Sequence, residues 1–109
     1  MSKFVGTNNK GFQMTFENGF RISVQWGIGN YCQRKEDGDF DDPRKTEFWE
    51  SLSAEIAVFG KDGEFITITN YPDVVAGWLS TDKVAKVITI VQSATTEEEI
   101  ETKLKAFNI

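Results

Sequence analysis

Two runs of alternating apolar and polar residues constrain this chain of 109 residues more than any other feature of its sequence. From Phe12 onward the apolar residues occupy every second position, and the alternation resumes at Phe20 and continues to Trp26. Side chains alternate between the two faces of a β-strand, so each run predicts a strand with one buried face.

The turn between these two strands follows from their register. A three-residue turn of residues 17–19 pairs Phe16 with Phe20 and keeps the apolar residues on one face. A two-residue Asn18-Gly19 turn would set Phe16 opposite Arg21 and mix the faces. The three-residue turn also places Gly19 where a left-handed residue is favoured. The same register makes two further apolar pairs, Met14 with Ile22 and Phe12 with Val24.

A second hairpin is predicted from "AEIAVFGKDGEFITI", residues 54–68, with its turn at residues 61–63. This register pairs Val58 with Ile66, and Phe59 and Phe65 share the opposite face. It also pairs Ile56 with Ile68. Two hairpins predict a four-stranded, mainly antiparallel sheet, whose two free edges leave self-association into a homo-oligomer as an option.

The remaining third of the chain has helical periodicity. Residues 72–79 are interpreted as a short helical turn that begins at Pro72. The stretch of residues 80–94 predicts a helix capped by Ser80 or Thr81, although the β-branched residues 88–90 leave a strand as the alternative. The apolar positions of this helix are Val84, Val87, Ile88 and Val91.

A clearer helix is predicted within residues 95–107, where Thr96 and Glu99 have the spacing of a capping box. Acidic residues occupy its first turn and lysines its last, as the helix dipole favours. Its apolar stripe is Ile100, Leu104 and Phe107. The prediction is one α+β domain over residues 1–109, with two C-terminal helices covering one face of the sheet.

Charge and composition limit the classes of partner. The chain has 12 basic and 17 acidic residues, a net charge of −5, which argues against general binding of nucleic acid or of an anionic membrane. No apolar run approaches the ~20 residues that cross a bilayer, and the N-terminal stretch lacks the apolar run of a secretion signal. With a single cysteine, the expected location is the cytoplasm.

Several candidate chemistries are incomplete. The chain has no histidine, so Cys32 lacks the usual activating base, and a packed or merely exposed thiol is the preferred interpretation. Asp37, Asp39 and Asp41 have the spacing of a calcium loop, but the later ligands are wrong. "WGIGNY" lacks the Lys-Ser pair of a phosphate loop. We expect no enzyme, metal or cofactor, although catalysis by carboxylates alone stays open.

A long non-periodic insert, residues 27–52, separates the two hairpins. Unstructured connections of this length are uncommon in compact domains unless they are functional or disordered. Its aromatic residues either pin the loop to the sheet or form a recognition surface with the neighbouring cations. These aromatic and basic residues are Tyr31, Phe40, Phe48, Trp49, Arg34, Lys35, Arg44 and Lys45. The candidate binding residues are Trp26, Tyr31, Arg34, Lys35, Arg44 and Trp49.

Three segments resemble a group of small proteins encoded by tailed bacteriophages. They are "KGFQMTFENGFRISVQWGIGNYC", "AEIAVFGKDGEFI" and "DVVAGWLSTDKVAKVI", which together fall within residues 10–92. The family has no assigned activity or catalytic residues, so the resemblance carries over no functional site. It implies expression inside a bacterial cell, where small phage accessory proteins often bind and disable a host component.

Two hypotheses for function follow. The first is a non-enzymatic protein that binds and inhibits or modulates a host protein, such as an antiviral defence or CRISPR component. The alternative is a small-molecule binder that sequesters a nucleotide-derived immune signal, with Arg21, Arg34 and Lys35 on phosphate and Trp26 or Tyr31 stacking a base. Convergence of these side chains on a concave pocket would favour the alternative, and a flat or convex arrangement would favour a protein partner.

Overall fold

The computed structural model describes residues 2–38, 43–71 and 73–109. Its sheet has five antiparallel strands in the order β1-β2-β3-β4-β5. In chain order the elements are β1 (Lys3–Gly6), β2 (Gly11–Thr15), β3 (Arg21–Gln25), the 3₁₀ helix η1 (Pro43–Thr46), β4 (Ala54–Phe59), β5 (Val75–Leu79), α1 (Thr81–Ser93) and α2 (Glu97–Phe107).

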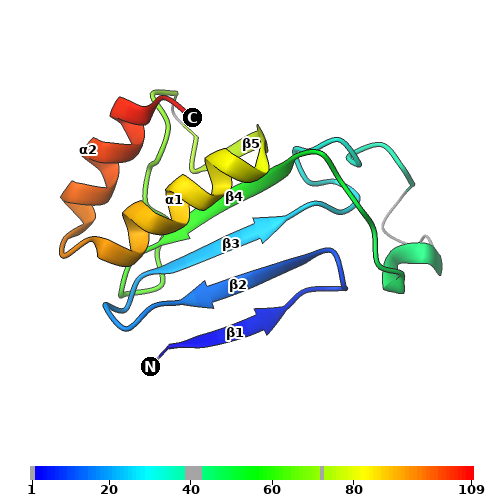
Figure 1. The fold of residues 1–109 in the computed structure, drawn as a ribbon, viewed down its shortest axis with the longest axis horizontal. Coiled ribbons are helices and arrows are strands. Elements are labelled where there is room, and N and C mark those ends of the chain that lie inside the picture. The colour runs from blue at the N-terminus through cyan, green and yellow to red at the C-terminus, as the bar shows by residue number, and fades with distance from the viewer. Residues whose placement is uncertain (1, 39–42, 72) are drawn as a thin grey trace.

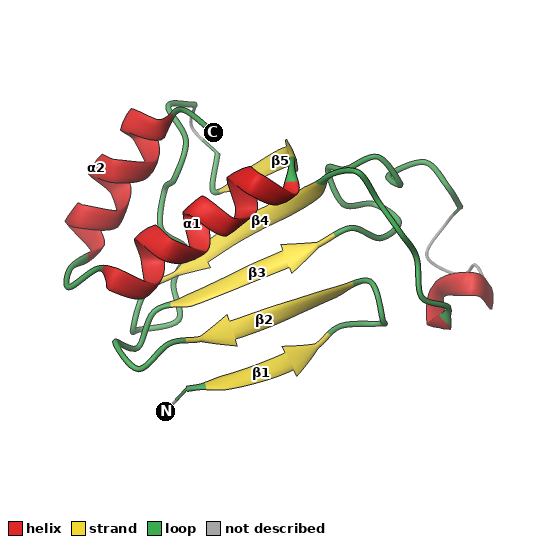
Figure 2. Ribbon diagram, viewed as in Figure 1, coloured by secondary structure: helices red, strands yellow, loops and turns green. Residues whose placement is uncertain are grey.

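Both α-helices lie on one face of the sheet, which confirms the predicted α+β class (Figures 1 and 2). Helix α1 packs on β3 and β4, and α2 packs beside α1. The core between the layers contains fully buried residues from both, among them Phe20, Ile22, Ile56, Val58, Val87, Val91, Ile100 and Leu104. All residues of β2 are half-buried and those of β1 are exposed, so the sheet is open at its β1 edge (Figure 1).

The first predicted hairpin is confirmed. Met14 pairs with Ile22, and the Phe16 N–H donates to the Phe20 carbonyl at 2.9 Å across the three-residue turn. Gly19 has a φ of 91°, a left-handed conformation that its lack of a Cβ allows.

The predicted count of four strands is wrong, because strand β1 was missed. Its four residues are all exposed and too few to show a period, so alternation could not reveal it. A tight turn joins it to β2, with Asn8 and Asn9 at φ values of 50° and 60°. Asparagine tolerates this left-handed conformation, so the Asn-Asn pair was the local signal for a hairpin.

The second predicted hairpin is correct only at its turn. The Ile66 N–H donates to the Val58 carbonyl at 2.8 Å, and Phe59 pairs with Phe65 as an isolated bridge. The chain then leaves the sheet, so residues 66–68 form no strand. Ile68 is nevertheless buried in the core.

Strand β5 takes the place that the predicted strand would have occupied. Ile56 pairs with Ala76 and not with Ile68, and Ala54 pairs with Leu79. The helical turn predicted for residues 72–79 is therefore wrong, and Pro72 itself lies outside the described residues. A register shift between Ala54 and Ile56 disturbs the alternation of β5 and conceals it from a period-based analysis.

Both C-terminal helices begin where the capping residues predicted. The Ser80 hydroxyl accepts from the Lys83 N–H, and the Thr96 hydroxyl accepts from the Glu99 N–H at 3.1 Å. The strand alternative for residues 88–90 is excluded, since they lie within α1.

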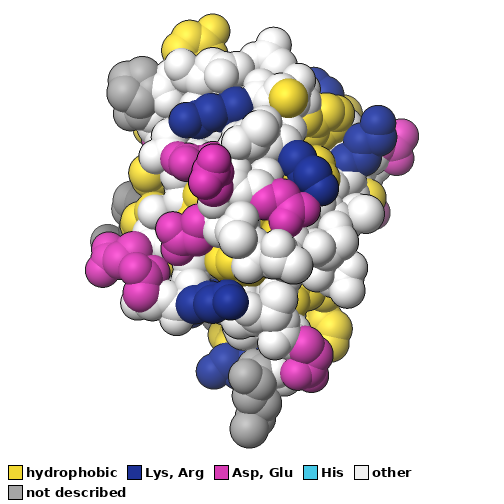
Figure 3. Space-filling view, turned by 90° about the vertical axis from the view of Figure 1, so that its left-hand side faces the viewer, with side chains coloured by type: hydrophobic (Ala, Val, Ile, Leu, Met, Phe, Trp, Pro, Cys, Tyr) yellow, Lys and Arg dark blue, Asp and Glu magenta, His cyan; other side chains and the backbone are white. Residues whose placement is uncertain are grey.

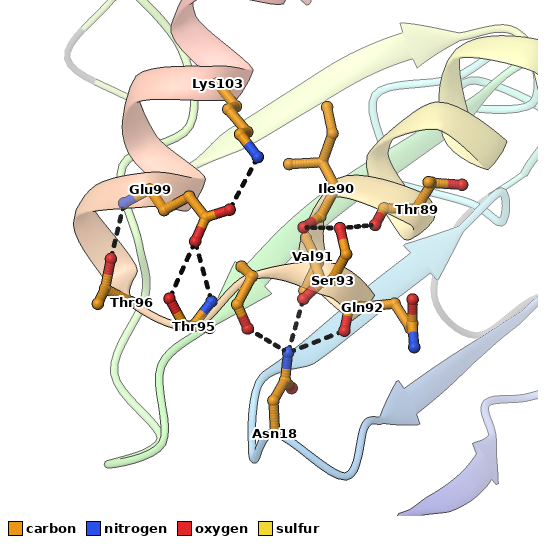
Figure 4. A network of polar contacts seen from close by, with 11 residues as sticks. Asn18, Thr89, Ile90, Val91, Gln92, Ser93, Thr95, Thr96, Glu99 and Lys103 are labelled. Carbon is orange, nitrogen blue, oxygen red and sulfur yellow. Dashed lines mark hydrogen bonds and ion pairs between the residues drawn. The ribbon is translucent and has the colours of Figure 1, made fainter.

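The Glu99 carboxylate does not accept the backbone N–H of the Thr96 cap, as a capping box would require. It accepts from the backbone and side chain of Thr95, one residue before the cap, and from Lys103 Nζ at 2.8 Å (Figure 4). The Lys103 and Thr95 bonds lower the pKa of Glu99 to about 2. These contacts tie the loop between the helices to the first turn of α2.

Candidate functional site

The structure divides the six candidate binding residues between two places. Four of them lie together at Trp49: Arg34 and Arg44 contact its indole ring, and Trp26 bonds to its backbone carbonyl. The other two, Tyr31 and Lys35, lie against the β5 edge. Phe40 and the side chain of Lys45 lie outside the described part of the chain.

The indole of Trp49 is contacted by three basic side chains, and we call these four residues the Trp49 cluster. Lys10 Nζ lies 4.7 Å from the ring centroid, and the guanidinium carbons of Arg34 and Arg44 lie 4.9 Å and 5.5 Å from it. All three distances fall within the range of cation–π attraction. The sequence analysis missed Lys10, which reaches the cluster from the turn before β2.

The Trp49 cluster also pins the insert to the sheet. Trp26 Nε1 donates to the Trp49 carbonyl at 2.8 Å. Lys10 is buried and donates to the Glu47 carbonyl, while Arg34 forms a 2.8 Å ion pair with Asp37. The interpretation that the aromatic residues fasten the loop is thus confirmed for Trp49, and the same contacts hold its ring beside a pocket.

This pocket lies between the sheet, α1 and the segment after Trp49, and we call it the α1 pocket. Its volume is about 460 Å³, within the ~300–1,000 Å³ typical of ligand sites. Of the described residues that line it, Glu50 alone is charged. The lining comprises Phe12, Val24, Trp26, Trp49–Ala54, Leu79, Thr81, Val84, Ala85 and Ile88.

Sequence reasoning identified Trp26 and Trp49 in this lining but missed the contribution of α1. Ile88 was assigned to the apolar stripe of that helix, yet it is only half-buried and faces the pocket. Ala85 lies one turn earlier at the same rim and is exposed. An apolar residue such as Ala85, outside the apolar stripe that faces the core, was the sequence signal for a second contact surface on this helix.

Tyr31 covers the β5 edge of the sheet. Its carbonyl accepts the Trp78 N–H at 2.8 Å, and the two rings lie 5.5 Å apart. Glu55 accepts the Tyr31 N–H at 3.0 Å, and Lys35 Nζ lies 5.7 Å from the Tyr31 ring centroid. Trp78 has a φ of 52°, which is unusual for a bulky residue and places it in a strained bulge. Trp78 was not among the predicted binding residues, because its segment has the apolar spacing of a helical turn.

Arg21 lies apart from both places. It projects from β3 on the face opposite the helices, where its guanidinium carbon lies 4.2 Å from the Phe59 ring centroid. Arg21, Arg34 and Lys35 therefore do not converge on one pocket, and none of them lines the α1 pocket.

Cys32 is buried, and its thiol contacts the Gly27 carbonyl oxygen at 3.7 Å. Burial raises its pKa above the ordinary value of 9.0, so the thiol stays protonated at neutral pH. This agrees with the interpretation of a packed thiol. In the part of the chain that the structure describes, no group of three metal-ligating side chains occurs. Asp39 and Asp41, of the proposed calcium spacing, lie outside that part.

The acidic residues of α2 stabilise the helix to which they belong. Glu97, Glu98 and Glu99 occupy its first turn, where the helix dipole favours negative charge. Glu101 pairs with Lys105 four residues later. On this side of the molecule acidic and basic side chains are interspersed (Figure 3). The arrangement fits a stabilised helix terminus, as the sequence analysis preferred.

No protein-family model, curated protein or solved structure matches this chain. Among residues 2–38, 43–71 and 73–109, no helix has the length and apolar character needed to cross a membrane.

Proposed function

We propose that this protein is a non-enzymatic binding protein that inhibits or modulates a host protein, and that it holds an apolar side chain of that protein in the α1 pocket. Tryptophan and arginine are enriched at the energetic centres of protein interfaces. Trp49 lines the pocket, and Arg34 and Arg44 contact the Trp49 ring.

The observation that carries this proposal is an apolar pocket whose rim is itself apolar and exposed. Leu52 lines the pocket and is 78% exposed, and Phe48, next to Trp49, is 84% exposed. Burying a side chain of this size contributes about 1.5–3 kcal/mol, so a partner that covers both gains substantially. An exposed large apolar residue in the lining of a pocket, with a second one close by in the sequence, is typical of an interaction site.

The charges around the pocket favour a polypeptide over a nucleotide. A phosphate needs converging cations, but the cations proposed for it, Arg21, Arg34 and Lys35, lie in three different places. Glu50 in the pocket wall would repel a phosphate. These positions support a polypeptide partner over a nucleotide.

The resemblance to phage-encoded proteins directs the proposal to a bacterial host protein, of which an antiviral defence or CRISPR component is one example. The net charge of −5 adds a long-range attraction to a basic surface, even with the charges interspersed.

Native mass spectrometry tests this proposal. The tagged protein is incubated with bacterial lysate, captured gently and measured with and without denaturation. An additional mass of polypeptide size, in stoichiometric amount, supports the proposal and gives the mass of the partner. A few hundred additional daltons per chain, lost on denaturation, would support the small-molecule alternative. Protein without any added mass would count against both.

A further inference from the structure

The two edges of the sheet are treated differently by the rest of the chain. At the β5 edge, the Tyr31 carbonyl bonds to the Trp78 N–H, and a bulge disturbs the strand. At the other edge, all four residues of β1 are exposed, including Phe4 at 78% and Val5 at 41%. An open strand edge presents unpaired backbone groups that favour pairing with another strand.

The direction of these backbone groups follows from the hairpin of β1 and β2. The Thr7 N–H donates to the Gly11 carbonyl at 3.1 Å, so Thr7 directs its backbone groups toward β2. Hydrogen-bonded and non-hydrogen-bonded residues alternate along antiparallel strands. Val5 and Lys3 therefore also face β2, whereas Phe4 and Gly6 direct their N–H and C=O groups outward.

Phe4 also ends an apolar row that runs across the sheet. It pairs with Met14, which pairs with Ile22, which in turn pairs with Val58. All four side chains lie on the face that carries the helices, but only the inner part of the row is covered. The row stops at an exposed phenyl ring on an open edge.

We propose that β1 pairs antiparallel with β1 of a second copy of this chain, about a twofold axis at Phe4. Opposed residues must share a face, so Phe4 can face Phe4 or Gly6 of the second copy, but neither Lys3 nor Val5. The pairing of Phe4 with its counterpart uses outward backbone groups on both strands. This pairing joins the apolar rows of the two copies into one row, which crosses the interface and runs from Val58 of one copy to Val58 of the other.

The charges at this edge are compatible with the proposed pairing. In the proposed register Lys3 lies opposite Val5 of the second copy, so no like charges face each other across the axis. Within each chain Lys3 pairs with Thr15 and Val5 with Gln13, which are uncharged. In Figure 1, α2 and β1 lie on opposite sides of α1, so the acidic residues of α2 do not border the β1 edge.

The strength of the dimer is limited by the length of the strand. Four residues bury little surface, and Lys3 at the edge is a residue that weakens such pairing. We expect a dimer that forms at high micromolar concentration, dissociates on dilution and makes a self-complementary interface.

Analytical ultracentrifugation of the purified protein over a range of concentrations tests the proposal. The wild type should approach twice the monomer mass of 12.3 kDa at high micromolar concentration. Phe4→Lys places two cations opposite each other on an exposed position and should give only monomer. Tyr71→Lys is the matched control, because Tyr71 is equally exposed at 75% and lies outside β1, and it should dimerise like the wild type.

A charge exchange tests the register. Phe4→Glu should also be monomeric alone, whereas an equimolar mixture of Phe4→Glu and Phe4→Lys should form a heterodimer, because position 4 faces itself. A monomeric wild type at every concentration would overturn the proposal. A dimer that survives Phe4→Lys, or a mixture that stays monomeric, would overturn the pairing at Phe4.

Discussion

The side-chain amide nitrogen of Asn18 lies 2.9 Å from the carbonyl oxygen of Val91, and this contact joins the first hairpin turn to the last turn of α1 (Figure 4). The same nitrogen lies 3.1 Å from the Gln92 carbonyl and 2.9 Å from that of Ala94. The final carbonyls of a helix have no partner within the helix. Asn18, more than seventy positions earlier in the chain, donates to the Val91 and Gln92 carbonyls, and the Val91 carbonyl also accepts the Ala94 N–H at 3.3 Å.

Asn18→Ala should lower the free energy of unfolding by about 1–2 kcal/mol, because the carbonyls at the end of α1 lose their shared donor. Asn18→Asp should cost more, since a carboxylate cannot donate and lies at the negative end of the helix dipole. Urea denaturation measures both. Wild-type stability in Asn18→Asp would contradict the role of this cap.

The pH dependence of stability should contain a contribution from Glu99. Its pKa in the folded protein is about 2, below the ordinary value of 4.5. The stabilisation is therefore present above pH 4.5 and is lost as the pH falls through the folded value. Unfolding measured along this range should show the advantage of the wild type over Glu99→Gln shrinking toward acid.

Glu98→Gln is the control for this measurement, because it removes an acid from the same helical turn and leaves the Lys103 bond intact. Its difference from the wild type should change less over the same range. An advantage over Glu99→Gln that is the same at both ends of the range would show that the Lys103 and Thr95 bonds do not stabilise the fold.

Cys32 should react slowly with thiol reagents in the folded protein. Burial hides the sulfur and raises its pKa above 9.0, so little thiolate exists at neutral pH. We expect the rate to be at least about tenfold below that in denaturant, and to rise as the pH increases. Equal rates in the folded and denatured protein would mean that the segment around Cys32 opens freely.

Gly77→Ala should displace the Tyr31 segment from the β5 edge. A Cβ at this position would lie 2.5 Å from Tyr31 Cβ and 2.9 Å from its carbonyl oxygen, closer than atoms can approach. The expected loss of stability is about 1–3 kcal/mol. Gly6→Ala is the matched control, since nothing lies within 4 Å of its added Cβ. Equal thermal stability of the two variants would contradict the packing at this edge.

The sequence predicted those elements that are marked by local signals, either apolar residues on one face or a capping residue. The alternation from Phe12 to Trp26 determines both strands and their register, because a shift by one residue would expose an entire apolar face. Ser80 and Thr96 mark helix starts through bonds to residues three positions away. Strand β1 is too short to show a period, and the bulge at Trp78 breaks the period of β5.

The candidate site was only partly predictable because its contacts join distant segments. Trp26 and Trp49 were predicted as binding residues, but the sequence does not show that the Trp26 side chain bonds to the Trp49 carbonyl, 23 positions later. Lys10 is buried within the Trp49 cluster. Its place in a polar turn of the sequence does not predict this burial. The α1 pocket combines side chains from Phe12 to Ile88, and a linear pattern does not contain that arrangement.

The proposed function is tested most directly by blocking the α1 pocket. Ala85→Arg places a long side chain at its rim on an exposed helix position, where arginine is nearly as favourable as alanine. Ala106→Arg is the matched control on α2, which contributes no residue to the pocket lining. Equal melting temperatures would first establish that both variants are folded.

The measurement is quantitative affinity capture from bacterial lysate with the wild type and these two variants. We predict one host polypeptide that the wild type and Ala106→Arg retain equally and that Ala85→Arg loses by at least about tenfold, which corresponds to 1.4 kcal/mol of binding free energy. Retention of the same polypeptide by all three proteins would contradict binding through the α1 pocket.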